Sequence, residues 1–353
     1  MSDSVEQKLS KLPYPNRNDT LGELKLIKEV IQDGDGCSKV ILQLPSPAIK
    51  REGELTKLIQ EVTGKNTTVE FESFQISTPR GLGSSLLASS KNIIAVASGK
   101  GGVGKSTVAC NLAAALSKMG CKVGILDADV YGPSQPLLLG ATKNQLKIKD
   151  KRILPVESHG MELMSMGFLM KPGDAVIWRG PMLHGMMQQF CRDVEWGELD
   201  FMIIDLPPGT GDVSLSLSQI IDISGAIIVS TPQDLALDVA TKAVGMFNKL
   251  GVPILGLVEN MSYYCCPKCN HRDDIFNHGG TAKAAEELQL SMLGDIPLNS
   301  ELRKAGDAGV PAVLRAPDSA PSQSLMKLAS EIAERISLNA RKTELQSEPA
   351  TAS

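Results

Sequence analysis

The glycine-rich sequence GKGGVGKST, residues 99–107, limits most strongly what this chain can fold into. It satisfies the pattern G-x-x-x-x-G-K-[ST], follows the apolar segment IIAVA and leads into the helix-forming sequence STVACNLAAALSKM. A strand, a glycine-rich loop and a helix in this order form a P-loop, whose backbone N–H groups and helix N-terminus surround nucleotide phosphates. The pattern therefore predicts a nucleotide site formed by Gly99, Lys100, Gly101, Gly102, Val103, Gly104, Lys105, Ser106 and Thr107.

Three side chains of this loop differ in their predicted roles. Lys105 is expected to reach the β- and γ-phosphates, and Ser106 is expected to ligate Mg²⁺. Lys100 is not needed to surround the phosphates, so its simplest interpretation is a solvated charge. A glycine-rich turn that binds nothing is the structural alternative for the whole loop, and the flanking strand and helix make it the weaker one.

Two further apolar segments end in carboxylates. The sequence KVGILDAD contributes Asp127 and Asp129, and FMIID contributes Asp205, which resembles a Walker B aspartate that holds Mg²⁺ through water. Carboxylates at the carboxyl edge of a parallel sheet lie beside the phosphate loop. We therefore expect Asp127 and Asp205 beside the metal and Asp129 orienting the attacking water, with capping of the next turn as the alternative for Asp127 and Asp129.

Hydrophobic patterning divides the chain into four regions. Near-continuous apolar strands alternate with helical stretches over residues 92–337, which is typical of a parallel sheet buried on both faces. The predicted fold class is α/β, a doubly wound, mostly parallel P-loop NTPase domain preceded by a small α/β domain at residues 1–74. Residues 75–91 have the composition of a flexible linker, and residues 338–353 form a polar tail predicted to be disordered.

Composition indicates the cellular setting. Seven cysteines, an odd number, in a chain without a signal-type apolar start favour reduced thiols and a cytoplasmic location. No apolar run approaches the roughly 20 residues of a membrane span. A net charge of −4 with 4% aromatic residues does not favour nucleic acid as a partner.

A second motif, YYCCPKCNH, contains a single C-x-x-C pair formed by Cys266 and Cys269. A redox dithiol is one interpretation, weakened because the pair follows a late strand. An intrachain zinc site could add Cys265, His271 or His278. A third interpretation places the pair on a twofold axis, where two chains supply four thiolates to one metal site.

Several stretches resemble a known family. SGKGGVGKST resembles the deviant Walker A motif of the family that includes MinD, the nitrogenase iron protein and the Mrp/ApbC scaffolds. LDADVYGPS, DLPPGTGD and VENMSYYCCPKC resemble the Mrp/ApbC branch, and the resemblance covers nearly all of residues 92–337. It implies that Lys100 crosses a dimer interface to the partner's nucleotide and that Asn260 contacts adenine; a simple turn residue is the alternative for Asn260.

The resemblance also implies a function. It predicts a homodimeric ATPase with Lys100, Lys105 and Asp129 in catalysis, slow hydrolysis coupled to conformational change, and a [4Fe–4S] cluster bridging two chains through Cys266 and Cys269. The cluster would be delivered to apoproteins, with contacts to assembly scaffolds, and zinc is the alternative metal. A MinD/ParA-like positioning or partition switch is the alternative function, and it leaves the C-x-x-C pair unexplained.

The N-terminal region resembles a small iron–sulfur assembly domain. Ile49 stands where that domain has a cysteine. The region is therefore expected to act in docking or regulation, without a direct thiol role.

Overall fold

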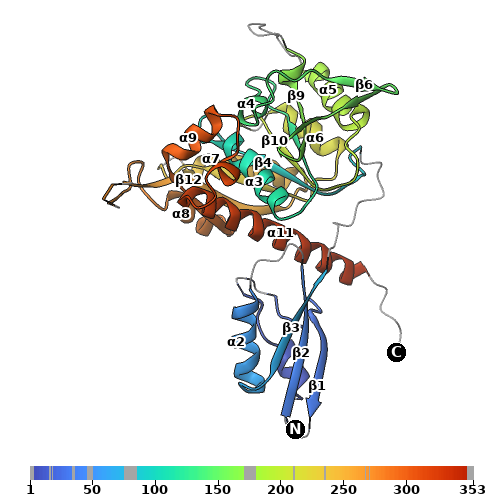
Figure 1. Ribbon diagram of the computed structural model, residues 1–353, viewed down its shortest axis with the longest axis vertical. Helices are drawn as coiled ribbons and strands as arrows, with labels where there is room; N and C mark the ends of the chain where they lie inside the picture. The colour runs from blue at the N-terminus through green and yellow to red at the C-terminus, as the bar shows by residue number, and fades with distance from the viewer. Residues whose placement is uncertain are drawn as a thin grey trace. The chain divides into compact units, whose positions relative to one another are not determined.

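The computed structural model describes residues 4–15, 17, 19–33, 36–45, 51–74, 86–170, 180–209, 211–233, 236–266, 268–269 and 271–347. The chain forms two compact units, one spanning Arg80–Ile332 and the other combining Met1–Pro79 with Ala333–Ser353 (Figure 1). The smaller unit is therefore discontinuous in sequence.

The larger unit is built on a mostly parallel sheet. Within the described residues it has nine strands in the order β13-β12-β11-β4-β10-β5-β9-β8, with β14 also paired with β12. The β8–β9 and β12–β13 pairs are antiparallel, whereas the pairs formed by β4, β5, β10, β11 and β14 are parallel. The bounds are β4 Ser90–Ala97, β5 Val123–Asp127, β8 Val156–Ser158, β9 Met161–Ser165, β10 Leu199–Asp205, β11 Gly225–Ser230, β12 Ile254–Cys265, β13 Arg272–Asp273 and β14 Met292–Leu298.

Helices alternate with these strands and bury them. The central residues Ile94, Ile203 and Ile228 are fully buried, as expected for strands covered on both faces. A small hairpin, β6 Lys147–Lys149 with β7 Arg152–Leu154, lies outside the main sheet. The helices are α3 Lys105–Lys118, α4 Gln135–Leu138, η1 Met166–Phe168, α5 Gly180–Asp193, α6 Asp212–Ile220, α7 Ala236–Lys249, α8 Gly280–Glu287, α9 Ser300–Asp307, α10 Ala312–Arg315 and α11 Ala320–Ser347.

The predicted fold class is confirmed. The apolar segments IIAVA, KVGILDAD and FMIID form strands β4, β5 and β10, and the mostly parallel sheet is the predicted one. Strand β4 lies between β10 and β11, which both come later in the chain. The carboxyl ends of β4, β5 and β10 meet at one edge, the usual ligand site of an open α/β sheet.

The smaller unit contains a three-stranded sheet in the order β1-β2-β3, with β1 antiparallel and β3 parallel to β2. Its elements are α1 Val5–Ser10, β1 Ile27–Asp33, β2 Gly36–Pro45, α2 Glu52–Thr63 and β3 Thr68–Phe74. The small α/β domain predicted at residues 1–74 thus combines a sheet with helices. Of the predicted linker, residues 75–91, positions 75–85 lie outside the described residues, as does Ile49, and residues 90–91 belong to β4.

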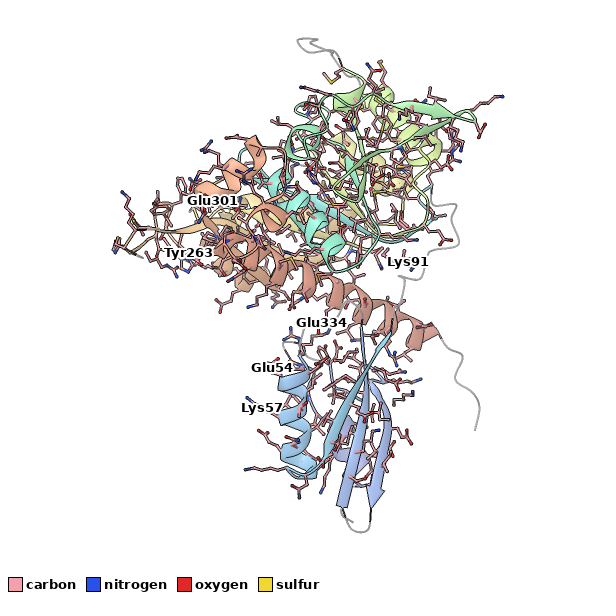
Figure 2. The ribbon with its side chains drawn as sticks, in the orientation of Figure 1. Glu54, Lys57, Lys91, Tyr263, Glu301 and Glu334 are labelled. Atoms are coloured by element: carbon pink, nitrogen blue, oxygen red, sulfur yellow. The ribbon has the colours of Figure 1, made fainter. Side chains whose placement is uncertain are left out.

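The prediction of a disordered tail from residue 338 is wrong as far as Ser347, because α11 continues to that residue. The physical reason is burial within the smaller unit, where Leu338 is fully buried and the Arg341 Nε donates to Leu24 O at 2.9 Å. Arg51 also pairs with Glu334 of α11 at 3.1 Å and with Glu54 of α2 at 3.2 Å; both glutamates are labelled in Figure 2.

Candidate nucleotide site and cysteine hairpin

The P-loop connects β4 to α3, and its glycines are required by its backbone. Gly102 has φ 80° and Gly104 has φ 82°, a left-handed conformation that favours glycine. A Cβ at Gly104 would also lie 2.2 Å from Asn260 Nδ2. This position therefore excludes any side chain on both backbone and steric grounds.

The start of the P-loop is held against the turn that follows β10. Ser98 O accepts a hydrogen bond from Gly209 N at 2.8 Å, and Ser98 Oγ donates to Lys100 O at 2.9 Å. The DLPPG segment, residues 205–209, thus contacts the P-loop directly through its backbone.

The structure brings together the side chains predicted for phosphate and metal chemistry. The buried Lys105 ammonium contacts Asp205 Oδ1 and lies 3.3 Å from Ser106 Oγ and 3.9 Å from Asp129 Oδ2. These groups come from α3, from the end of β10 and from the loop after β5. One ammonium is therefore surrounded by carboxylates at the carboxyl edge of the sheet.

Asp127 is the most enclosed of these carboxylates, with no exposed surface. Its oxygens accept hydrogen bonds from Ser165 Oγ at 2.9 Å, Gln135 N at 3.0 Å and Asp129 N at 3.2 Å. Burial, followed by the charge of Asp205, raises the pKa of Asp127 to about 7 despite these donors. The charged form of this side chain is therefore disfavoured unless a cation is near it.

Asp129 caps the turn after β5 and also faces Lys105. Its Oδ1 accepts from Tyr131 N at 3.3 Å and Gly132 N at 3.2 Å, which caps the turn, while its Oδ2 faces Lys105. Burial raises the pKa of Asp129, although the Lys105 charge acts in the opposite direction. The capping bonds fix the carboxylate and leave one oxygen directed to the site.

Gln135 is a residue of the site that the sequence analysis missed. Its fully buried side chain donates from Nε2 to Asp205 Oδ2 at 2.8 Å and to Ser106 O at 3.0 Å. Its Oε1 has no hydrogen-bond partner among the described residues. A polar residue at the first position of the helix that follows DADVYGPS is the signal that could have identified it.

The donor set fits Mg²⁺. Asp127, Asp129 and Asp205 supply three carboxylates against the single Lys105 ammonium, and Ser106 adds a hydroxyl, so the site is rich in hard oxygen donors. No group of three or more His, Cys, Asp or Glu side chains converges on one metal position within the described part of the chain. Such a site suits Mg²⁺, which keeps several waters and takes few direct protein ligands.

Lys100 and Asn260 make contacts outside this cluster of carboxylates. Lys100 is partly exposed, and its Nζ donates to Gln233 Oε1 at 2.7 Å. Asn260 is buried, and its Nδ2 donates to Val103 O at 2.8 Å. Asn260 therefore supports the P-loop backbone from strand β12.

Strand β12 continues into the segment that carries the C-x-x-C pair, which we call the cysteine hairpin, residues 263–278. Tyr264 pairs with Asp273 and Cys265 with Arg272, and Cys266 N donates to His271 O at 2.9 Å. In Figure 1 the hairpin projects from the edge of the larger unit; Figure 2 labels Tyr263 at its beginning.

The thiols of this hairpin are open to the surface. Cys266 is half-buried, whereas Cys269 and Cys265 are exposed. Hydrogen bonds from the backbone N–H groups of Lys268 and Cys269 lower the pKa of Cys266, which favours the thiolate that binds metal. The hairpin thus fits an iron–sulfur cluster as two thiolate ligands, half of the usual four.

The residues considered for an intrachain zinc site do not gather around this pair. His278 Nδ1 lies 3.0 Å from Ser262 Oγ and 3.6 Å from Glu259 Oε1, at the base of the hairpin. Across the described residues no cluster of three metal-ligating side chains is formed. Cys266 and Cys269 thus offer two thiols to a metal, with no third His, Cys, Asp or Glu ligand beside them among the described residues.

The described residues also contain no helix of the length and apolar character needed to span a membrane.

Known proteins with similar sequences are iron–sulfur proteins. The chain is 43% identical over 344 residues to an iron–sulfur cluster carrier protein of Deinococcus radiodurans, covering 96% of each chain. It is 48% identical over 248 residues to the mouse iron–sulfur cluster transfer protein NUBPL, covering 70% of this chain and 78% of that one.

Solved structures agree on the fold of the larger unit. A nucleotide-binding protein of Archaeoglobus fulgidus in complex with ADP is 41% identical, with a TM-score of 0.59 over 66% of this chain and 91% of that chain. MinD of Pyrococcus horikoshii with Mg-ADP is 27% identical, with a TM-score of 0.51 over 68% of this chain and 95% of that chain.

Residues 89–333 match the family described as ParA, NUBPL iron-transfer P-loop NTPase, which is most of the larger unit. The match includes both the P-loop and the cysteine hairpin. This chain belongs to the NUBPL iron-transfer P-loop NTPase family.

Proposed function

We propose that this chain is an iron–sulfur cluster carrier that binds and hydrolyses ATP as a homodimer and delivers its cluster to apoproteins. The observation that carries the proposal is the half site. Cys266 and Cys269 present two thiols at the surface of a P-loop NTPase. The names of its relatives, iron–sulfur cluster carrier and transfer proteins, support the same cargo.

ATP hydrolysis would take place among the carboxylates at the carboxyl edge of the sheet. Lys105 would bind the β- and γ-phosphates, and Ser106 with Asp127 and Asp205 would hold Mg²⁺ through hydroxyl and water-mediated contacts. Asp129, fixed by two backbone N–H groups, would orient the attacking water. Mg²⁺ would supply neutralisation of the negative charge that the phosphates and the buried carboxylates bring together.

Adenine recognition is assigned to Asn260. Its Oδ1 can act as acceptor toward a base while its Nδ2 holds Val103 O, because an amide presents a donor and an acceptor group. This amide also links β12 to the P-loop.

The cluster half of the function needs two chains. Cys266 and Cys269 on a twofold axis give four thiolates, the number that a [4Fe–4S] cluster takes. The exposure of Cys269 supports this arrangement, because a shared ligand must be accessible to a second copy. Zinc in the same four-thiolate arrangement is the alternative metal.

Lys100 would couple nucleotide binding to the arrangement of the two chains in the dimer. Its ammonium is held at the surface by the exposed side chain of Gln233, a contact that a phosphate of the partner's nucleotide can replace with a stronger, charge-assisted one. ATP binding would then favour one arrangement of the dimer. Hydrolysis would be slow and coupled to the change between arrangements.

The test is anaerobic reconstitution followed by transfer. Protein incubated with iron and sulfide is assayed for iron, sulfide and zinc, and then mixed with an apoenzyme whose activity depends on a [4Fe–4S] cluster. We expect activation of the apoenzyme by the loaded chain and none by the Cys266→Ser, Cys269→Ser double variant. Zinc in place of iron, with no uptake of iron, would contradict the carrier function and leave the ATPase function intact.

A further inference from the structure

Glu259 lies in β12 immediately before Asn260 and is 1% exposed. Its carboxylate accepts hydrogen bonds from both sides of the cysteine hairpin. On the incoming side Ser262 Oγ donates at 2.5 Å; on the outgoing side Gly279 N donates at 3.3 Å and Thr281 N at 2.9 Å. One buried side chain therefore closes the base of the segment that carries Cys266 and Cys269.

The hairpin has little other regular structure to hold its two arms together. Strand β13 is two residues long, and the β12–β13 ladder contains only the Tyr264–Asp273 and Cys265–Arg272 pairs within the described residues. A short two-stranded hairpin is marginally stable by itself. The contacts at its base therefore have a large share in fixing the position of the cysteines.

The backbone between Glu259 and the hairpin departs from a regular strand. Met261 has φ 57°, in the left-handed region, and the pairing of β12 with β14 shifts between Asn260 and Tyr264. A non-glycine residue keeps such a conformation only where its surroundings fix it. Here the Asn260–Val103 contact fixes the chain just before Met261, and the hydrogen bond from Ser262 to Glu259 fixes it just after Met261.

Adjacent residues of a strand point to opposite faces. Glu259 is directed to the hairpin base and the N-terminus of α8, and Asn260 is directed to the P-loop. We propose that Glu259 is a positioning residue for the cluster-binding cysteines, which holds the cysteine hairpin in a fixed relation to the P-loop. The cargo named here rests on the proposed function, whereas the hairpin geometry does not.

The proposal is tested first on the full chain without a cluster, by hydrogen exchange with mass spectrometry. We expect Glu259→Ala to speed exchange in the cysteine hairpin and at Gly279 and Thr281 about ten-fold, the effect of losing local hydrogen bonds. Exchange in β4 and β10 should stay as in the wild type. Glu259→Gln keeps one acceptor oxygen and the same shape but turns an NH2 group toward a backbone N–H, so it should restore the protection in part and give exchange between wild type and Glu259→Ala.

Asp274→Ala is the matched control on the same hairpin. Asp274 forms an exposed ion pair with Arg272 at 3.1 Å, and such pairs contribute little, so exchange should not change. If Glu259→Ala does not fold, Ser262→Ala provides the same test by removing one contact. Wild-type exchange of the hairpin in both Glu259→Ala and Ser262→Ala, or equal loss of protection through the whole larger unit in Glu259→Ala, would overturn the proposal.

The second readout is the rate at which a chelator removes iron from reconstituted protein. Glu259→Ala should release iron about ten-fold faster than wild type, in step with its faster hairpin exchange, and Glu259→Gln should lie between the two. A loosened hairpin with unchanged iron release would overturn the positioning role. Failure of wild type to bind iron would refute the proposed function, while hydrogen exchange would still decide the role of Glu259.

Discussion

Lys105 and Asp205 form a buried ion pair at the carboxyl edge of the sheet, with the ammonium between the P-loop and the end of β10. The lysine that is expected to bind phosphate is thus already bound to a carboxylate. Nucleotide binding must replace this contact or share it, and the stability of the site and its affinity for nucleotide are therefore linked through one side chain.

The first prediction concerns this pair. Lys105→Ala should weaken ATP binding roughly 10–100-fold, the loss of charge-assisted hydrogen bonds to phosphate, measured by equilibrium titration. Asp205→Asn should lower the free energy of unfolding without nucleotide by about 3 kcal/mol, because the buried ammonium loses its nearer carboxylate and keeps only Asp129 at 3.9 Å. In a double-mutant cycle measured by chemical denaturation, the variant carrying both Lys105→Met and Asp205→Leu should lose less free energy of unfolding than the Lys105→Met and Asp205→Leu single variants lose together. Additive losses would contradict the ion pair.

The second prediction separates binding from catalysis. Asp129→Asn keeps the size of the side chain and its capping of the turn but loses the charge beside Lys105. ATP affinity should remain within a small factor of wild type, whereas the turnover number should fall by roughly 10²–10⁴-fold. Phosphate release under saturating ATP measures this. Wild-type turnover in Asp129→Asn would remove this residue from the catalytic assignment.

The third prediction follows from the raised pKa of Asp127. The folded state holds the Asp127 proton up to about pH 7, whereas the unfolded chain releases it near its usual value of 3.8. Stability contributed by this group is therefore lost as pH rises between these values. Asp127→Asn, which cannot ionise, should gain on the order of 2–4 kcal/mol relative to wild type between pH 4 and pH 8, in the absence of Mg²⁺ and nucleotide.

Chemical denaturation of both proteins at several pH values checks this third prediction. A stability difference that does not change with pH would show that Asp127 is ionised normally in the folded protein. Adding Mg²⁺ with nucleotide should stabilise wild type at pH 8 more than the variant, because the cation compensates the Asp127 charge.

The fourth prediction concerns Lys100. Lys100→Ala should retain much of the ATP affinity, since Lys105 and the P-loop backbone remain, but it should lose hydrolysis and the effect of ATP on the dimer. Sedimentation with and without Mg-ATP measures the assembly. Gln233→Ala removes the neighbour of Lys100 within the chain and serves as the control, with the ATP response kept. An ATP-independent assembly in wild type would contradict the interchain role.

The fifth prediction concerns the cysteine hairpin. Reconstituted wild type should hold about four irons per dimer. Cys266→Ser or Cys269→Ser should each abolish the cluster, since one substitution removes two of four ligands from a symmetric site, whereas Cys265→Ser should be tolerated. Iron and sulfide analysis with visible absorption tests this. About one zinc per monomer, lost on changing His271, His278 or Cys265, would instead identify an intrachain site.

Structural features that have local physical causes can be predicted from the amino-acid sequence. The two left-handed glycines of the P-loop, Gly102 and Gly104, and the alternation of apolar strands with helices can be read from neighbouring residues, because backbone conformation and burial period are local properties. The spacing of Cys266 and Cys269 is equally local. These features were sufficient for the fold class, the phosphate loop and the half site.

Contacts between residues of different elements become visible in the folded chain alone. The position of Gln135 between Asp205 and Ser106 depends on how β5 and β10 pair. The contacts of Glu259 depend on where the chain returns to β12 after the cysteine hairpin, 20 and 22 positions later. The helical course of residues 338–347 was missed for the same reason. Their composition is polar, and their order comes from the surface of the smaller unit that buries Leu338, a contact with residues some 300 positions earlier that no local pattern contains.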